Sequence, residues 1–231
     1  MKVSFWHKCW EQSRIGFHQD QVHPFLSQYL FPLINKQDRH VFVPFSGKTL
    51  DMRWLAQHMK VSGSELSEIA CRDFFSEGNI DSQIKVYQEC QSDVKFQQFS
   101  SDSITLWQGD FFKLNAKHII SEQNLLIDWI YDRAALIALP IEMQQAYVNH
   151  LVSFIGKGTK LFLISVEFPS QEMSGPPFPI TEQDIKQLFL SANKHCKIEC
   201  IASRELENKR FAQRNFEVSH LLERLYIITL P

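Results

Sequence analysis

The sequence lacks a glycine-rich phosphate loop and any pair of cysteines at metal-binding spacing. No G-x-G-x-x-G run occurs, and the five cysteines form no CxxC pair. An odd number of unpaired cysteines argues against a disulfide framework and a structural zinc site, so reduced thiols are expected. His195, Cys196 and Cys200 lie together in "HCKIEC", but small thiols are common core residues and we expect no metal there.

Long stretches of one charge and long apolar runs are also missing. The formal net charge is −2, without a basic or acidic block, which argues against nucleic acid or an anionic membrane surface as partner and favours a small molecule. The longest apolar region, "LLIDWIYDRAALIALPI", is interrupted by Asp128, Asp132 and Arg133, and "MKVSFWHKCW" has no apolar core of signal-peptide length. We therefore expect a cytoplasmic protein without a membrane segment.

The 231 residues suffice for one domain with a sizeable core, and no Pro/Gly/Ser-rich linker divides them. We expect a single domain and a monomer.

Strand-like and helix-like segments alternate along most of the chain. This alternation predicts an α/β fold, with a mostly parallel sheet covered by helices on both faces. The C-terminal part departs from it and predicts an antiparallel hairpin at the sheet edge. Predicted strands cover residues 40–45, 60–66, 103–112, 124–133, 160–168, 197–205 and 223–230, and predicted helices cover residues 49–59, 67–78, 140–156 and 180–194.

The stretch "VFVPFSGKTLDMRWLAQ" contains Gly-Lys-Thr between a strand and a helix, as a phosphate-binding P-loop does. A P-loop also needs a glycine five residues before its Gly-Lys, because the first glycine supplies the turn that lets backbone N–H groups wrap a phosphate. Phe42 holds that position, inside the apolar run 41–45. The turn is too short to hold a triphosphate, which argues against a P-loop kinase.

Ligands of open α/β sheets lie beyond the carboxyl ends of the strands. The residues after the first four predicted strands are therefore candidates: Phe45 to Lys48, Glu65, Asp110 with Phe111, and Asp132 with Arg133. Glu65 is the strongest, since a carboxylate at the end of the second strand can accept both ribose hydroxyls of a nucleoside cofactor. The alternative is a solvated Glu65 at the start of a helix.

The scarcity of glycine also bears on the cofactor. A dinucleotide needs the missing glycines so that its pyrophosphate can approach a helix N-terminus, whereas only Gly47 is present here. S-adenosylmethionine has a nucleoside at one end, an amino-acid tail at the other and no phosphate. It suits this turn better than a nicotinamide cofactor.

Six blocks of the sequence resemble the thiopurine S-methyltransferases in their bacterial form, in the same order and over nearly the whole length. They are "FWHKCWEQSRIGFHQDQVHPFL", "VFVPFSGKTLDMRWLAQ", "VSGSELSEIACRDFF", "DWIYDRAALIALP", "SGPPFPIT" and "LERLYIITL". The resemblance implies the Rossmann-like S-adenosylmethionine-dependent methyltransferase fold, with a seven-stranded sheet. It also implies an N-terminal helical lid over residues 1–35 and a catalytic core over residues 36–231. The implied acceptors are aromatic or heterocyclic thiols and, in bacteria, selenium and tellurium compounds.

The resemblance also implies roles for particular residues. Cofactor contacts come from Trp10, Phe45, Glu65 and Arg133, with Trp6, Phe17, Asp110 and Phe111 nearby. On the acceptor side it implies Phe17, Pro176, Pro177 and Phe178, together with a second arginine that is either Arg210 or Arg214. Arg133 and Arg210 are the candidates for catalysis. The sequence departs from the family at Phe45-Ser46, where Leu-Cys is common, so a bulkier cofactor floor is expected.

The residues alone leave alternatives open. An aromatic stripe such as Trp6 and Trp10 is often core packing, although ring faces are suitable partners for a sulfonium cation. Arg133 can instead form a structural ion pair with Asp128 or Asp132, and "SGPPF" can be only a rigid linker. A nicotinamide-dependent oxidoreductase and a non-catalytic cofactor-binding module remain as alternative functions.

Overall fold

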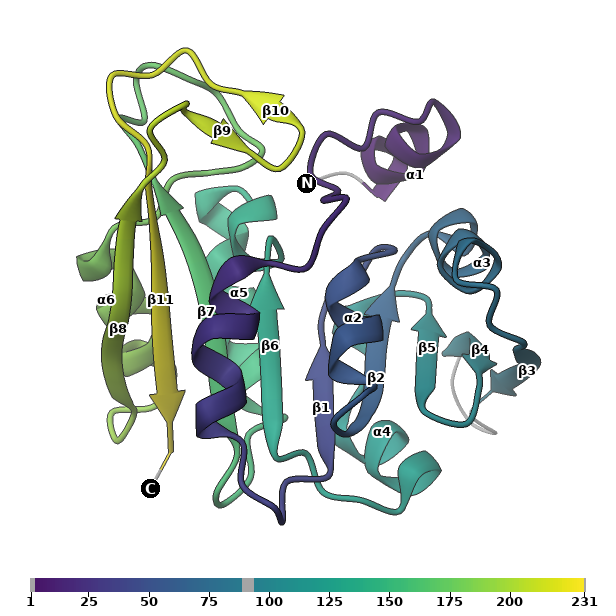
Figure 1. Cartoon of the computed structure of the whole chain (residues 1–231). Coiled ribbons are helices and arrows are strands. Elements are labelled where there is room, and N and C mark those ends of the chain that lie inside the picture. Colours follow the sequence, from purple (N-terminus) through teal and green to yellow (C-terminus); the bar gives the residue numbers. More distant parts are fainter. Residues whose placement is uncertain (1–2, 89–93, 231) are drawn as a thin grey trace. The chain divides into compact units, whose positions relative to one another are not determined.

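A computed structural model describes residues 3–88 and 94–230 of the chain. The chain divides into two compact units, here called the N-terminal unit (residues 2–126) and the C-terminal unit (residues 127–231). Both contain strands and helices, and Figure 1 labels their elements.

The N-terminal unit has five strands in the order β3-β4-β5-β2-β1. β2 is parallel to β1 and to β5, while β4 is antiparallel to β3 and β5. Its helices are α1 (Val3–Glu11), α2 (Leu50–Leu55), α3 (Glu68–Glu77) and α4 (Ala116–Gln123), with short turns η1 (Leu26–Leu30), η2 (Phe31–Leu33) and η3 (Phe111–Lys113). Its strands are β1 (His40–Val43), β2 (Lys60–Glu65), β3 (Gln83–Gln88), β4 (Lys95–Ser100) and β5 (Ile104–Gln108).

The C-terminal unit has four strands in the order β6-β7-β11-β8 and a separate β9–β10 hairpin. β6 and β7 are parallel, and β11 is antiparallel to both β7 and β8, as the C-terminal pattern predicts. The strands are β6 (Trp129–Arg133), β7 (Lys160–Glu167), β8 (Lys197–Glu205), β9 (Arg210–Phe211), β10 (Arg214–Asn215) and β11 (Leu222–Thr229). The helices are α5 (Ile141–Val152), α6 (Glu182–Ala192) and the short η4 (Leu136–Ala138).

The predicted α/β class is confirmed, but the expected count of seven strands is too low. Among the described residues, the N-terminal unit contributes five sheet strands and the C-terminal unit four, because the antiparallel β3 and β4 precede β5. Every residue of β3 is exposed, so no buried face marks this strand, although Ile84 and Val86 alternate with polar residues. The predicted strand 124–133 begins only at Trp129, because Asn124 caps the end of α4 with φ of 50° and residues 125–128 connect this cap to β6 without strand pairing.

The helix starts follow the local sequence closely. Thr49 and Ser67 cap α2 and α3 by accepting backbone N–H groups with their side chains. Thr181 and Asp184 form a capping box at the start of α6. Each such cap satisfies backbone donors that a helix start leaves open and contributes about 1 kcal/mol.

The central strands of each unit carry its core. Val41 and Phe42 of β1 and Leu106 of β5 are fully or almost fully buried in the N-terminal unit, and so are residues 161–164 of β7 in the C-terminal unit. Burying a side chain of this size stabilises a fold by about 1.5–3 kcal/mol. Among the described residues, no helix combines the length and the apolar character needed to cross a membrane.

Candidate active site

The turn between β1 and α2 brings the backbone of "FSGKT" up to the end of β2. Phe45 and Gly47 both have a left-handed backbone, with φ of 47° and 53°. The N–H of Gly47 donates to Glu65 Oε2 at 2.8 Å, and the N–H of Ser46 donates to the Ser64 carbonyl at 2.8 Å. A Cβ on Gly47 would lie 3.3 Å from the Trp10 ring. Glycine therefore suits both the backbone and the close approach of the indole.

Lys48 of the same turn faces α3. Its Nζ lies 2.5 Å from Glu77 Oε1 and 3.5 Å from Asp73 Oδ2. A P-loop lysine must reach phosphate oxygens. In this structure the two carboxylates of α3 hold Lys48 instead. This arrangement agrees with the sequence argument against a P-loop, in which Phe42 replaces the first glycine.

Glu65 ends β2 and is only 7% exposed. Its Oε1 accepts the N–H of Ser67 at 2.7 Å while its Oε2 accepts Gly47, so two backbone donors fix the carboxylate. Burial raises the pKa of Glu65, and the backbone N–H groups of Ser67, Gly47 and Leu66 oppose the rise. Each carboxylate oxygen has a second lone-pair site. The group can therefore accept two further hydroxyls, as a ribose diol requires.

Aromatic rings from three segments gather in the N-terminal unit. Phe17 makes edge contacts with both Trp6 and Trp10, each at 5.6 Å between ring centroids, and Phe45 makes one with Phe111 at 5.2 Å. Trp10 and Phe111 are buried. The predicted Asp110 is exposed, and its Oδ1 accepts the N–H of Phe112 at the start of η3.

These residues fit a nucleoside cofactor that carries a sulfonium. Ring faces stabilise such a cation by about 0.5–2 kcal/mol, and Glu65 offers acceptors for hydroxyls. The hydroxyl oxygen of Ser46 is buried in the same turn without a hydrogen-bond partner among the described residues. A buried polar atom without a partner is uncommon in folded proteins, and the polar groups of a bound nucleoside would supply one.

In the C-terminal unit, Arg133 is the last residue of β6 and is 9% exposed. The neighbouring Asp132 is fully buried. Its Oδ2 accepts the hydroxyl of Tyr147 at 2.7 Å and its Oδ1 accepts the N–H of Leu136 at 3.2 Å. Tyr147 and the following turn thus engage Asp132, in place of the ion pair with Arg133 that the sequence allows. Burial raises the pKa of Asp132 to about 6, against the opposing effect of its donors.

The proline loop "SGPPF", residues 174–178, is held at several points. The N–H of Phe178 donates to the Ile137 carbonyl at 2.7 Å, and Arg214 Nη1 donates to the Pro176 carbonyl at 2.9 Å. The peptide bonds before Pro176 and Pro177 are both cis. Arg210 instead donates from Nε to the carbonyl of Ala212 within its own hairpin, at 3.1 Å. Of the two candidate arginines, Arg214 is therefore the one that braces this loop.

Several supporting residues escape the sequence-based prediction. Ser64 and Ser67 help to hold the turn around Glu65, and Tyr147 holds Asp132. The sequence identifies Tyr147 only as part of an amphipathic helix. A tyrosine on such a face signals core packing, and its hydroxyl finds a partner only through the tertiary fold.

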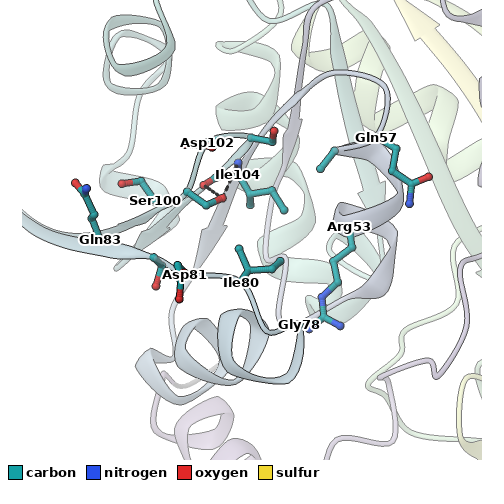
Figure 2. Close-up of a pocket in the computed structure, with 13 residues that line it drawn as sticks. Arg53, Gln57, Gly78, Ile80, Asp81, Gln83, Ser100, Asp102 and Ile104 are labelled. Carbon is teal, nitrogen blue, oxygen red and sulfur yellow. Dashed lines mark hydrogen bonds between the residues drawn. The ribbon is translucent and has the colours of Figure 1, made fainter.

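A polar hollow lies elsewhere in the N-terminal unit, at the amino end of β5. Figure 2 shows Arg53 and Gln57 on one side and Asp81, Ser100 and Asp102 on the other. Glu65 and Asp110 lie beyond the opposite, carboxyl ends of β2 and β5. The hollow is therefore separate from the predicted cofactor residues, and none of the predicted site residues lines it.

The cysteines fit the expectation of unpaired thiols as far as they are described. Cys9, Cys71, Cys196 and Cys200 are free, and Cys90 lies outside the described residues. Within residues 3–88 and 94–230, no group of three or more His, Cys, Asp or Glu side chains is placed to hold a metal ion.

Comparison with solved structures places the fold among methyltransferases. A SAM-dependent methyltransferase from Anabaena variabilis matches with a TM-score of 0.63 and 14% identity, over 99% of this chain and 95% of that one. A Burkholderia thailandensis N1-methyltransferase, solved with S-adenosylhomocysteine bound, matches with a TM-score of 0.58 and 13% identity, over 98% and 87% of the two chains.

Sequence comparison gives the family. The model of the family "Thiopurine S-methyltransferase (TPMT)" matches residues 1–230. A thiopurine S-methyltransferase of Nitrosospira multiformis is 36% identical over 99% of this chain and 98% of its own length, and one of Photobacterium profundum is 35% identical over 99% of both. The turn beside Glu65, the aromatic rings and these matches agree: the chain belongs to the thiopurine S-methyltransferase family, as an S-adenosylmethionine-dependent methyltransferase that acts on a small-molecule acceptor.

Proposed function

We propose that this methyltransferase acts on the sulfur of small aromatic or heterocyclic thiols of the thiopurine type, with selenium and tellurium compounds as further acceptors. The observation that carries the proposal is the braced proline loop, in which Arg214 bonds to Pro176 and Phe178 bonds to η4. A rigid wall of prolines and an aromatic ring suits a flat acceptor, and a guanidinium beside it suits an anion. The names of the relatives support the same acceptor class.

On the cofactor side, we assign the ribose hydroxyls to Glu65. Trp10, Trp6, Phe17 and Phe45 are proposed to face the sulfonium and the nucleoside, while Asp110, Phe111 and Arg133 complete the cofactor contacts. When bound, S-adenosylmethionine supplies a methyl group on a positively charged sulfur. The aromatic rings exclude water from this region, and Glu65 orients the nucleoside.

On the acceptor side, the proposed roles are positioning and charge stabilisation. The acceptor thiol loses its proton to solvent, and Arg133 and Arg214 favour the resulting thiolate because a guanidinium stays protonated at working pH. The bound cofactor would supply the methyl group, and Arg133 and Arg214 would hold the thiolate that accepts it. Correct orientation of two reactants can supply about 7–11 kcal/mol. No dedicated base is therefore assigned.

Between the two arginine candidates, the contacts favour Arg214 over Arg210. Arg214 bonds to the proline loop and its guanidinium carbon lies 5.5 Å from the Phe216 ring centroid, whereas the Arg210 guanidinium bonds to Ala212 of its own hairpin. Arg210, the catalytic candidate implied by the resemblance, is therefore retained only as the second candidate. Phe17, Pro176, Pro177 and Phe178 complete the proposed acceptor contacts.

The remaining expectations stay proposals. We propose a single functional domain in which residues 1–35 act as a lid over a core of residues 36–231, and a cytoplasmic monomer. A nicotinamide-dependent oxidoreductase is set aside, because the cofactor assigned through the family is S-adenosylmethionine. A module that binds this cofactor without turnover is the alternative that an activity test addresses.

The decisive experiment is a methyl-transfer assay with purified protein and a panel of acceptors. The panel contains aromatic thiols, aliphatic thiols, selenium and tellurium oxyanions, phenols and amines, and mass spectrometry identifies the methylated atom. We expect the highest kcat/KM for aromatic or heterocyclic thiols. Faster turnover of a phenol or an amine than of every thiol and selenium compound would contradict the proposal, and cofactor binding without any turnover would favour the non-catalytic module.

A further inference from the structure

Asp132 and Tyr147 form a buried pair behind the turn that carries Arg133. Both side chains are fully buried, and the Tyr147 hydroxyl donates to Asp132 Oδ2 at 2.7 Å. Successive side chains of a strand point to opposite faces. Asp132 and Arg133 therefore project on opposite sides of β6, and Asp132 affects the position of Arg133 through the backbone that joins them.

The pair also holds the turn after β6. Asp132 Oδ1 accepts the N–H of Leu136, the first residue of η4, at 3.2 Å, and the N–H of Ala135 also bonds to this carboxyl group. Ala134, which connects the end of β6 to Ala135, has a left-handed backbone with φ of 63°. A non-glycine residue holds this conformation only where its surroundings impose it. The carboxylate supplies that constraint from inside the unit.

The same turn supports the proline loop. The carbonyl of Ile137, in the middle of η4, accepts the N–H of Phe178 at 2.7 Å. Two residues before Phe178, the carbonyl of Pro176 accepts a hydrogen bond from the Arg214 guanidinium. A continuous chain of hydrogen bonds and short backbone segments thus leads from Tyr147 on α5, through Asp132 and η4, to the proposed acceptor wall.

We propose that the Asp132–Tyr147 pair is a positioning element for the acceptor: it fixes the turn that carries Arg133 and, through η4, the proline loop. The proposal rests on the acceptor-side roles given under the proposed function. Neither side chain is a catalytic residue, since each acts through the backbone of other residues.

The protonation state of Asp132 should control this positioning. The groups that face its carboxyl group are the Tyr147 hydroxyl from α5 and the N–H groups of Ala135 and Leu136 from the following turn, and its aligned neighbour on β7 is the apolar Leu163. All of these polar groups are donors, so the ionised carboxylate can accept from each of them. A protonated carboxyl group carries a hydrogen of its own, which points at these donors and takes the place of one accepted hydrogen bond. Protonation of Asp132 therefore weakens its hydrogen bonds to the turn after β6.

The test compares Tyr147→Phe with a matched control, Tyr226→Phe. Tyr226 is also a fully buried tyrosine of the C-terminal unit, but it lies on β11 near Arg224 rather than beside η4. We expect Tyr147→Phe to lower kcat/KM for an aromatic thiol about tenfold, mainly through KM, because small displacements of positioning groups have effects of this order or larger. The affinity for S-adenosylhomocysteine, measured by calorimetry, should fall less than kcat/KM in Tyr147→Phe, because Arg133 is one of several proposed cofactor contacts, and it should stay unchanged in Tyr226→Phe.

The pH profile separates positioning from simple loss of stability. With an electron-poor aromatic thiol that stays ionised throughout, wild-type kcat/KM should fall on the acid side of about pH 6, where Asp132 becomes protonated. Tyr147→Phe removes a donor that lowers the pKa of Asp132, so its inflection should move to higher pH. Asp132→Asn should have no such inflection if it folds. An unchanged inflection and an unchanged KM in Tyr147→Phe would overturn the proposal, even if that variant melted at a lower temperature.

Hydrogen exchange gives a readout that does not depend on turnover. The amide of Phe178 should exchange faster in Tyr147→Phe than in the wild type or Tyr226→Phe, since its acceptor Ile137 lies in the turn that Asp132 holds. Equal exchange in all three proteins would overturn the positioning role. If the wild type methylated no thiol while this difference in exchange appeared, the acceptor assignment would be wrong and the link between the pair and the proline loop would stand.

Discussion

Each unit of the molecule places one buried carboxylate at the end of a parallel strand, and the two differ in their partners. Glu65 ends β2 in the N-terminal unit and accepts two backbone N–H groups, while Asp132 lies near the end of β6 in the C-terminal unit and accepts a phenol hydroxyl and the N–H groups of the next turn. Burial raises the pKa of both groups.

This difference shows how one type of side chain serves two purposes. Glu65 is 7% exposed and accepts the N–H of Gly47, whose turn approaches Trp10, so its remaining lone pairs can meet a ligand. Asp132 is fully buried, with the Tyr147 ring beside it. We infer that the Glu65 carboxylate binds the cofactor and that the Asp132 carboxylate positions the turn after β6.

The largest expected effect is on the pH dependence of the free energy of unfolding, through the titration of Asp132. Its pKa is about 6 in the folded protein, against an ordinary value of 3.8, so ionisation costs more in the folded state. The penalty is nearly absent at about pH 3, grows as the pH rises, and is nearly complete at about pH 7. The whole shift corresponds to about 3 kcal/mol. The free energy of unfolding of wild type minus that of Asp132→Asn should therefore decrease by about 3 kcal/mol between pH 3 and 7, with about 2 kcal/mol of this change between pH 4 and 6.

Urea unfolding of the two proteins at several pH values measures this difference. Only the change with pH is diagnostic, because Asp132→Asn also loses hydrogen bonds at every pH. If this difference in unfolding free energy stayed constant from pH 4 to 6, the pKa of Asp132 would not be raised in the folded protein.

The next effect concerns cofactor binding at Glu65. Glu65→Gln places an amide where a charged acceptor now meets two backbone donors, and Glu65→Ala removes the acceptor. Losing a charged hydrogen-bond partner costs about 1.5–3 kcal/mol, or about ten- to more than a hundredfold in affinity. Calorimetric titration with S-adenosylmethionine should show this loss in a folded variant.

Glu68→Gln is the matched control for this prediction. Glu68 lies three residues further on, in the first turn of α3, and pairs on the surface with Arg72. Its removal should leave cofactor affinity nearly unchanged. Wild-type affinity in folded Glu65→Gln would remove Glu65 from the proposed cofactor site and end the contrast with Asp132.

A smaller effect is expected from Arg133→Lys, which keeps the charge and loses the planar fork. Lysine acts as a point charge and cannot hold an anion through two parallel N–H groups. We expect kcat/KM to fall about tenfold for anionic acceptors, and less for neutral ones. Steady-state kinetics with one thiolate and one neutral thione measure the contrast. Equal activity of wild type, Arg133→Lys and Arg214→Lys towards thiols would contradict the proposed acceptor site.

The smallest effect concerns the proposed lid. We expect the segment from about residue 4 to 28 to become ordered when cofactor and acceptor bind, because Trp6 and Phe17, unlike the buried Trp10, are only half-buried and need a further surface. The structure narrows this range at its C-terminal end: the N–H of His23 donates to Asp51 Oδ1 at 2.8 Å, and Leu26 is fully buried. Ligand-dependent change should therefore concentrate before residue 23.

Limited trypsin digestion can detect this change at the exposed Arg14. S-adenosylhomocysteine should slow cleavage after Arg14 several-fold and leave cleavage after the exposed Lys157 unchanged as an internal control. Equal cleavage after Arg14 with and without the ligand would argue against a lid.

Local sequence by itself determined many of the strands, helices and helix starts. Apolar periodicity indicated β1, β2, β5, β7, α5 and α6, and short-range chemistry fixed helix starts at Ser67 and Thr181. Glu65 was identifiable because a strand end and the following helix cap lie within a few residues of it. Such signals depend on neighbours in the chain, and a sequence displays them directly.

Only the tertiary structure decided which distant groups meet. Tyr147 reaches Asp132 across 15 positions of the sequence and Arg214 reaches Pro176 across 38. The approach of Trp10 to Gly47 also depends on the packing of separate segments. Burial and hydrogen-bond geometry select these partners in space, and no periodicity encodes them. For that reason the sequence left open an ion pair of Arg133 with Asp128 or Asp132, and only the fold shows that Asp132 accepts the Tyr147 hydroxyl.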